Sequence, residues 1–545
     1  MKRQLSSACL GVLLAAAVAA VAQEMPAVRM ENGASQFLVQ GKPFLMLAGE
    51  LGNSSAGTAA EADTILPRLA ALHFNTVLMP VAWDEIEPQE GQFDFSIPDH
   101  WIEVARREHI HLVFLWFGSW KNAFSEYAPA WVMANAQRFP REISAEGMPL
   151  GILSPLGEET MQCDARAFAA LMRHVKETDA AQQTVLMVQV ENEIGFLGVG
   201  GRDRSEAANR LFAGPVPAEL LRALQADRAR LPYAMDKEFN PAGKTWQAAF
   251  GNAADEVFMA WEYGRFANTV AAAGKKEYAL PVYMNAQLPA PLEQPGSYPS
   301  GGPYPRDQVI YRVAAPAIDF YSPDIYWPDF ENWIEKYRDQ GNPVFVPEAR
   351  LDQAPFNALY TFGEGRGFGF SPFAVDSLPA QAPADDKGPD LSDEYAALSE
   401  MSDALISAQA KNQTRALVLH ATSWRPTQTV ALGGYLFRAS LARSWPAMTP
   451  EETDGAMLVI ESGTNEFTVM GSGLRVEFLR DPDMDNQAAG IAGIEQMAYT
   501  DGKWTVAREL NGDQSDQGRA LLMDAHAFRV YRLRLYAVPR GQAKP

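Results

Sequence analysis

Carboxylate side chains stand at the ends of two apolar segments of this chain. Residues 184–195, TVLMVQVENEIG, run through apolar side chains into Glu191, Asn192 and Glu193. A second segment, PVFVPEAR, ends its apolar run at Glu348. Ionised groups are costly to bury without partners, so acidic residues at the edge of buried strands indicate a chemical role. Two carboxyl groups held close together can divide the work of acid/base and nucleophile.

The elements around these residues alternate between strands and helices. We predict eight strands, most of them apolar throughout, as strands covered on both faces are. They span residues 44–51, 75–83, 111–118, 184–191, 281–285, 318–324, 343–348 and 358–363. Apolar residues at helical spacing lie between them, for example Ile65, Leu69 and Leu72. This alternation predicts an α/β fold, a (β/α)8 TIM barrel. An open doubly wound sheet is the alternative, although no glycine-rich phosphate loop follows the first strand.

The two ends of the chain differ from this pattern. Residues 1–22 contain Lys2 and Arg3, then an apolar run and small residues, which is typical of a secretory signal peptide. A membrane anchor is the alternative, but the run is short for the roughly 20 residues that a span needs. After about residue 412, short β-rich segments are separated by Gly, Asp and Asn turns, which predicts an all-β, sandwich-like domain.

We therefore expect a signal peptide at 1–22, the barrel at 23–412 and the β-domain at 413–545, in a protein exported to the periplasm or beyond the cell. With 47% hydrophobic residues the chain can bury a large core. Its net charge of -21, or -23 without the signal peptide, repels nucleic acid and anionic lipid and suits a neutral substrate. Only Cys163 would remain after processing, so we expect no intramolecular disulfide, and we predict no metal site and no cofactor.

In a (β/α)8 barrel the reacting groups lie at the C-terminal ends of the strands. Glu193 ends the fourth predicted strand and Glu348 the seventh, nearly across the barrel. Their side chains can converge over the mouth of the barrel, and two carboxyl groups about 5 Å apart would suit double displacement at a sugar carbon, with one as acid/base and the other as nucleophile. Solvated caps or ion-pair partners are the alternative. Glu191 faces the opposite way from Asn192 in an extended strand, so we predict a structural role for it.

Other polar and aromatic residues fall at the same end of the predicted barrel. Trp83 ends strand two and would form a floor for a sugar ring, because pyranose C–H faces stack on aromatic rings. Tyr326 would hydrogen-bond the nucleophile, and Glu50 and Asn285 would bind substrate hydroxyl groups. Arg350 would favour the ionised form of the nearby carboxylate, with an ordinary salt bridge as the alternative. For the aromatic residues, ordinary packing is the alternative.

Three segments resemble glycoside hydrolase family 35, the retaining β-galactosidases. They are VQVENEIG, VAWDEIEPQEGQFDF at 81–95 and MLAGELGNSS at 46–55, and the resemblance spans about residues 36–412. The resemblance implies that Glu193 is the acid/base, that Glu348 is the nucleophile and that Asn192 binds the sugar 2-hydroxyl.

The chain also departs from that family. Where family members often carry a His-Tyr pair after strand one, this chain has Gly52-Asn53, and the family's Ala-Glu-Trp on strand three is replaced by LWFGSWKN at 115–122. We predict that Asn53, Trp120 and Asn122, with Lys121, take over this part of the sugar site.

The expected function is retaining exo-hydrolysis of terminal β-linked galactose from the side chains of oligo- or polysaccharides. A retaining glycosidase for a β-glucoside, β-mannoside or arabinoside is the alternative, because the family's galactose contacts are missing. A non-catalytic carbohydrate-binding barrel is a third interpretation, disfavoured because both carboxylates are present. The sequence does not indicate an oligomeric state.

Overall fold

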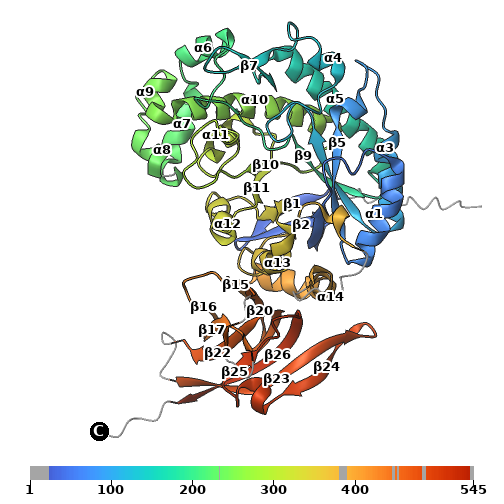
Figure 1. Ribbon diagram of the computed structural model, residues 1–545, viewed down its shortest axis with the longest axis vertical. Coiled ribbons are helices and arrows are strands. Elements are labelled where there is room, and N and C mark those ends of the chain that lie inside the picture. The colour runs from blue at the N-terminus through green and yellow to red at the C-terminus, as the bar shows by residue number, and fades with distance from the viewer. Residues whose placement is uncertain are drawn as a thin grey trace, which may run out of the picture.

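The computed structural model describes residues 24–231, 233–379, 390–444, 449–450, 453–481 and 487–539. The predicted signal peptide lies outside the described residues. Helices surround a central barrel of strands, and a second body of antiparallel strands lies against one side of it (Figure 1).

The central sheet closes into a barrel. Its segments are parallel and follow the order β12-β14-β4-β5-β6-β9-β10-β11-β13. Their bounds are β4 (Met46–Glu50), β5 (Thr76–Ala82), β6 (His111–Phe117), β9 (Val185–Val190), β10 (Val282–Gln287), β11 (Phe320–Ile325), β12 (Phe345–Val346), β13 (Glu348–Ala349) and β14 (Gly369–Phe370). Only Pro347, which has no N–H for the ladder, separates β12 from β13 in the chain. These two segments are therefore the halves of strand seven, and the prediction of a TIM barrel is confirmed.

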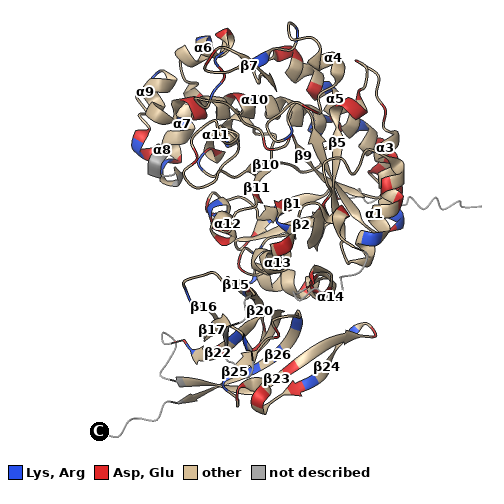
Figure 2. Cartoon of the chain, viewed as in Figure 1, with Lys and Arg blue, Asp and Glu red and all other residues tan. Residues whose placement is uncertain are grey.

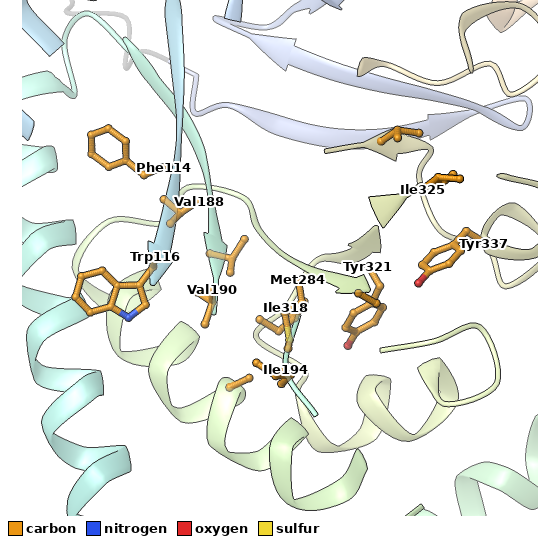
Figure 3. Packing of buried hydrophobic residues seen from close by; sticks show 14 of the residues in the cluster. Phe114, Trp116, Val188, Val190, Ile194, Met284, Ile318, Tyr321, Ile325 and Tyr337 are labelled. Atoms are coloured by element: carbon orange, nitrogen blue, oxygen red, sulfur yellow. The ribbon is translucent and has the colours of Figure 1, made fainter. Parts of the chain in front are cut away.

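Helices cover the outside of the barrel. They are α1 (Ala59–Ala71), α3 (Ser96–Arg107), α5 (Glu158–Asp179), α10 (Ala254–Glu277), α11 (Gln308–Ala314), α12 (Phe330–Asp339), α13 (Ala354–Gly363) and α14 (Leu391–Ala410). The loops contain α2 (Trp83–Ile86), α4 (Ala130–Met133), α6 (Glu206–Ala213), α7 (Ala218–Ala226), α8 (Tyr233–Glu238), α9 (Trp246–Phe250) and a hairpin of β7 (Arg141–Ile143) and β8 (Pro149–Leu153). Between the barrel strands and these helices lies a core of buried apolar side chains. Figure 3 shows Trp116, Val190 and Met284, from three barrel strands, in this core.

The eighth predicted strand is wrong. Residues 358–363 belong to α13, and strand eight is β14, which follows a glycine-rich turn. Every residue of α13 is buried, because the helix lies between the barrel and the C-terminal domain. A short run that is apolar on all sides has the same sequence pattern in a buried helix and a buried strand, so periodicity could not separate them.

An N-terminal antiparallel sheet closes the end of the barrel where the strands begin. It consists of β1 (Ala27–Glu31), β2 (Ala34–Val39) and β3 (Lys42–Phe44), and the sequence analysis did not predict it. Ser35 of β2 bridges strands seven and eight, since its Oγ accepts the N–H of Val344 at 2.7 Å and its own N–H donates to the Arg366 carbonyl at 2.9 Å. The N-terminal sheet is thus tied to the barrel by hydrogen bonds.

Aromatic side chains fill the interior above this sheet. We call Phe37, Tyr283, Phe320, Phe345 and Phe368 the barrel floor; all are at most 1% exposed. The ring centroids of Phe345 and Phe368 lie 5.2 Å apart in a stacked pair, and those of Tyr283 and Phe320 lie 5.4 Å apart. This dense packing supports the strand ends at the opposite side of the barrel.

The C-terminal domain is a sandwich of two antiparallel sheets, which confirms its predicted class. One sheet has the order β15 (Thr414–Leu419), β20 (Gly455–Gly463), β21 (Glu466–Ser472), β26 (Arg529–Pro539), β23 (Gln487–Thr500) and β24 (Lys503–Leu510). The other has the order β16 (Thr427–Leu432), β17 (Tyr435–Leu441), β22 (Leu474–Arg480) and β25 (Ala520–Leu522). Apolar residues of both sheets, such as Phe437 and Phe467, form its core.

The sandwich packs directly on the barrel. Strands β15 and β20 contact α13, and Ala416 and Leu458 share one apolar cluster with the barrel helices. A Cβ atom on Gly363 would lie 2.5 Å from that of Ala416, so the close approach needs glycine. His420 forms ion pairs with Glu331 of α12 and with Asp454, and these contacts raise its pKa to about 10.

Charged residues of both signs are spread over the outer helices and the sandwich, whereas the barrel strands carry few of them (Figure 2). Among the described residues no helix is long and apolar enough to cross a membrane. Cys163 is a free, buried thiol on α5.

Candidate active site

Four polar side chains form the uppermost interior layer of the barrel. Along a strand, side chains alternate between the interior and the helices, so Met46, Ala48 and Glu50 of β4 all face inward. The same alternation places Asn285 above Tyr283 on β10 and Asp324 above Phe320 on β11. Glu348 begins β13 beside Asp324, with which it is paired in the sheet. Apolar floor and polar top are therefore successive layers of the same strands. In addition to Glu50, the top layer comprises Asn285, Asp324 and Glu348.

The turn after β9 adds Asn192 and Glu193 to this layer. Glu191 and Glu193 both have left-handed backbone conformations, with φ of 59° and 48°. Such conformations are uncommon in residues with a side chain and recur at functional sites. Gly195 holds the end of this turn against the loop after β10, where a Cβ atom would lie 2.1 Å from the Pro299 carbonyl oxygen.

Glu348 accepts hydrogen bonds from three sides. Its Oε2 accepts the hydroxyl of Tyr326 at 2.8 Å, and its Oε1 accepts the side-chain amides of Asn192 and Asn285, each at 3.3 Å. Donors on three sides fix the orientation of this carboxylate. This is the environment that a carboxylate nucleophile needs.

Asn285 joins the groups of the layer. Its Oδ1 accepts the backbone N–H of Glu193 at 3.0 Å, and its Nδ2 donates to Asp324 Oδ2 at 2.7 Å as well as to Glu348. One amide thus orients the strand-four turn relative to strands six and seven.

Carboxyl oxygens of Glu193, Asp324 and Glu348 lie within 4.8 Å of one another. Two like charges at this separation repel by about 3 kcal/mol at an effective dielectric constant of about 20, so all three cannot easily be ionised. Burial, reinforced by the charge of Glu348, raises the pKa of Glu193 to about 8. Glu193 is consequently protonated at neutral pH and able to act as an acid.

Lys121 supplies the positive charge of this cluster. Its side chain is 5% exposed, and its Nζ donates to Asn192 Oδ1 at 3.0 Å. Burial alone would lower the pKa of Lys121, but the nearby carboxylates, first of all Glu348 and Glu193, raise it above its usual value. Carboxylates this close can also hold a cation. Here the buried ammonium already occupies that electrostatic role, and we assign no metal ligands.

The structure brings most of the predicted site residues together. Glu193, Glu348, Asn192, Asn285 and Tyr326 form one hydrogen-bonded cluster. Glu193 and Glu348 each expose 4% of their surface, so both still reach solvent.

Two predicted substrate contacts lie elsewhere. Trp83 is fully buried, packs edge-on against Trp131 and donates its ring N–H to Glu87 at 2.8 Å. Trp120 is also fully buried and donates its ring N–H to the Leu153 carbonyl at 3.1 Å. Neither ring has a free face for a sugar, because both faces pack against neighbouring residues. The two tryptophans therefore support the loops behind the active site.

Three further predictions have mixed outcomes. Arg350 pairs with Asp352 through two hydrogen bonds, so its predicted effect on Glu348 is wrong. Glu50 exposes no surface, and burial together with the charge of Glu348 raises its pKa well above the usual value. Glu191 accepts the backbone N–H of Trp120 at 2.9 Å, in keeping with a structural role.

The two remaining candidates lie in loops at the rim. Asn122 is exposed in a left-handed turn with φ of 51°, and its backbone N–H donates to Asn192 Oδ1 at 3.3 Å. Asn53 is half-buried after β4, and its Oδ1 has no hydrogen-bond partner among the described residues.

Asp324 is a site residue that the sequence analysis did not select. It lies near the end of a predicted strand, as Glu193 and Glu348 do, and the same rule of position would have found it. The preceding residues, Ser-Pro, make Asp324 look like part of a turn, and for this reason its position at the end of a strand was not used.

Two family models match parts of the chain. Residues 57–214 match the glycoside hydrolase family 42 model, described as beta-galactosidase, and this segment contains Glu193. Residues 391–522 match a domain of unknown function, DUF5597, which begins with α14 and continues into the sandwich. The barrel is therefore like that of a glycoside hydrolase. The finer resemblance to family 35 stays a prediction.

Individual proteins match over limited regions. A beta-galactosidase of Xanthomonas manihotis is 42% identical over 62 residues, which are 11% of this chain and 10% of that protein. Among solved structures, a beta-galactosidase from Bacillus circulans sp. alkalophilus is 14% identical, with 67% of this chain and 57% of that chain covered and a TM-score of 0.44. A beta-mannanase from the blue mussel Mytilus edulis is 14% identical, with 70% and 98% covered and a TM-score of 0.42.

Proposed function

We propose that the protein is a retaining exo-glycoside hydrolase that releases terminal β-linked galactose from oligo- or polysaccharide side chains. The observation that carries the proposal is the carboxyl pair of Glu193 and Glu348, whose oxygens lie within 4.8 Å. Retaining enzymes place their two carboxyl groups about 5 Å apart, whereas inverting enzymes need roughly 6.5–9.5 Å to admit a water.

In the first half of the reaction Glu348 attacks the anomeric carbon while Glu193 protonates the departing oxygen. The bond from the sugar to the leaving group breaks as the bond to Glu348 forms. In the second half Glu193, now ionised, takes a proton from water, and the water oxygen displaces Glu348. Tyr326, Asn192 and Asn285 hold the nucleophile in place through their hydrogen bonds to it. No step requires a cofactor.

Galactose as the sugar is supported by the match of residues 57–214 to a beta-galactosidase model. The replaced strand-three segment favours a second candidate, in which the same reaction acts on a β-glucoside, β-mannoside or arabinoside. Lys121 stands in that segment, where family 35 often carries a glutamate, and would present a donor rather than an acceptor to the sugar hydroxyls. Export, as residues 1–22 suggest, would give the enzyme access to polysaccharides.

The test is hydrolysis of a panel of aryl β-glycosides, with the anomeric form of the first product followed by NMR. We expect cleavage of the galactoside with retention of the anomeric configuration. Cleavage of another glycoside but not of the galactoside would keep the mechanism and identify a different sugar as the substrate. Glu348→Gln should lose activity about 10³-fold or more on every substrate. Glu193→Gln should lose least on the substrate with the most acidic leaving group, since that group needs no proton.

A matched control is Glu206→Gln, because Glu206 lies on the exposed helix α6 with its side chain 88% exposed. It should retain normal activity. Inversion of the anomeric centre, or activity that survives both carboxylate substitutions, would contradict the proposal.

A further inference from the structure

Two carboxyl groups of the upper layer have no part in the reaction proposed above. Glu50 and Asp324 are 0% and 1% exposed. A carboxyl oxygen of Asp324 lies within 4.8 Å of carboxyl oxygens of Glu193 and Glu348, and Glu50 faces the charges of the same two residues. A hydrogen bond between two carboxyl groups needs a proton on one of them, because ionised carboxylate oxygens only accept.

No N–H or O–H group of the described residues takes the place of that proton. Neither oxygen of Glu50 accepts from such a donor, and the same holds for Asp324 Oδ1. Asp324 Oδ2 accepts only the amide of Asn285. A buried carboxylate with unpaired oxygens that face other carboxylates would be doubly unfavourable, so these two groups gain most from being neutral.

We propose that Glu50 and Asp324 are neutral acids that position the two reacting carboxyl groups, with the Glu50 hydroxyl donating to Glu348 and the Asp324 hydroxyl donating to Glu193. The inference rests on the proposed function, because that function identifies Glu193 and Glu348 as the reacting pair. The inference extends the proposed function, because it states which carboxyl groups of the site carry protons.

The charges that face these groups agree with the assignment. The titratable side chains around Glu50 and Asp324 are those of Lys121, Glu193, Glu348, Tyr283, Tyr326 and Tyr337. Lys121 is the single cation among them. With Glu50, Asp324 and Glu193 protonated, the ammonium of Lys121 balances the charge of Glu348. Burial and the neighbouring carboxylates also raise the pKa of both Glu50 and Asp324 well above their usual values.

The arrangement has a consequence for each half of the reaction. When Glu193 has given its proton to the leaving group, the Asp324 hydroxyl donates to the new carboxylate and stabilises it. The proton stays on Asp324 throughout, so this residue positions the acid/base and takes part in no bond change. Glu50 acts in the same way on Glu348 before it attacks.

An amide is a close copy of a neutral carboxyl group, and this permits a sharp test at Asp324. In Asp324→Asn the side chain can still accept from Asn285 and donate to Glu193. In Asp324→Leu it can do neither. We expect kcat/KM within about tenfold of the wild type for the Asn variant and a loss of about 100-fold for the Leu variant.

The pH profile separates this role from a purely structural one. The basic limb of kcat/KM reports ionisation of the acid/base Glu193. If Asp324 is a neutral donor, its loss in the Leu variant removes support from ionised Glu193, and the basic limb moves to higher pH. If Asp324 is an anion, its loss removes a repelling charge, and the limb moves to lower pH. An unmoved or lowered limb, or an Asn variant as inactive as the Leu variant, overturns the assignment.

If the Leu variant fails to fold, the Asn variant alone shows whether Asp324 is neutral or ionised. Its basic limb stays within about half a pH unit of the wild type for a neutral Asp324 and falls by more for an anionic one. Failure of the proposed function itself is recognised separately, because Glu193→Gln and Glu348→Gln would then remain active.

Glu50 provides an independent pair of variants, Glu50→Gln and Glu50→Leu. The acidic limb of kcat/KM reports the nucleophile, which must be ionised. We expect the Leu variant to move this limb to higher pH and the Gln variant to restore activity to within about tenfold of the wild type. A limb that stays in place or moves to lower pH would show that Glu50 carries a charge.

Discussion

The two ends of the barrel are built from the same strands in opposite ways. At the floor, the rings of Phe345 and Phe368 stack with no polar atom to satisfy. At the upper end, a few residues further along the same strands, buried carboxyl groups crowd one ammonium and Glu193 sits in a left-handed turn. Burial at the floor supplies free energy of folding, whereas burial at the upper end consumes some of it.

This difference shows how the barrel separates stability from chemistry. Groups whose pKa is shifted by burial and by like charges are unfavourable in the folded state, and such groups are what acid/base chemistry requires. The floor must compensate for them. Substitutions at the two ends should therefore have opposite effects on stability and activity, and four experiments examine this contrast.

The largest effect is expected from Phe368→Ala at the floor. Removal of a fully buried phenyl ring leaves a cavity and should lower the free energy of unfolding by about 3–5 kcal/mol. Urea denaturation measures this. The folded fraction should keep a kcat close to that of the wild type, and a kcat that falls by more than about tenfold would mean that the two ends are not separable.

Tyr326→Phe should have the next largest effect, and on activity alone. It removes the 2.8 Å hydrogen bond to Glu348, and a bond to a charged group contributes about 1.5–3 kcal/mol, so kcat/KM should fall about 10–100-fold. The melting temperature should change little. Tyr360→Phe, which alters a hydroxyl on the outer helix α13, serves as the control and should leave kcat/KM intact.

Glu193→Gln should be more stable than the wild type although its activity is reduced. The pKa of Glu193 is raised to about 8 in the folded protein, so between its ordinary value and pH 8 the unfolded chain releases the proton more readily. Wild-type stability therefore falls as the pH rises through this window, and the Gln variant escapes the loss. We expect a gain of about 1–3 kcal/mol at pH 8 that disappears near pH 4.

Thermal unfolding of both proteins at the two pH values tests this, with Glu206→Gln as a variant that should show no such dependence. Equal stability of wild type and Glu193→Gln at pH 8 would argue that burial of this carboxyl group carries no cost.

The smallest effect is expected in the rim turn. Asn122 has φ of 51°, a conformation that costs an alanine about 1 kcal/mol, so Asn122→Ala should lower the free energy of unfolding by about that amount. Asn122→Gly, which adopts the turn freely, should stay close to the wild type. Equal stability of the two variants would show that the turn relaxes without strain.

Position in the barrel explains what could be predicted from the sequence. Glu193 and Glu348 were found because apolar strands ended at them, and the strand count placed them on opposite sides of one opening. The strand pattern does not show whether a side chain at the end of a strand is covered by a loop. Trp83 and Trp120 were therefore predicted to contact substrate, although loops enclose both. Those enclosures depend on contacts between segments far apart in the sequence, such as that of Trp120 with the Leu153 carbonyl.

The N-terminal sheet was missed although its own pairing is local. Strand β2 pairs with β1 and β3 through turns at Asn32-Gly33 and Gln40-Gly41, which are typical of hairpins. Only the attachment of this sheet to the barrel, through the hydrogen bond between Ser35 and Val344, has no local signal. Asp324 is different, because its position was available from the strand pattern and only its turn-like neighbours concealed it.

That bridge from Ser35 to Val344 also bears on how the chain reaches its native state. The two residues are 309 positions apart, and a contact of this length is slow to form because the chain between them must first be brought into a loop. The start of the barrel therefore has to wait for its end to be synthesised. Until then the floor residue Phe37 lacks its ring partner Phe368, and its aromatic surface is open to association with other chains. The segment that seals the finished barrel is thus exposed to misassembly while the protein is being made.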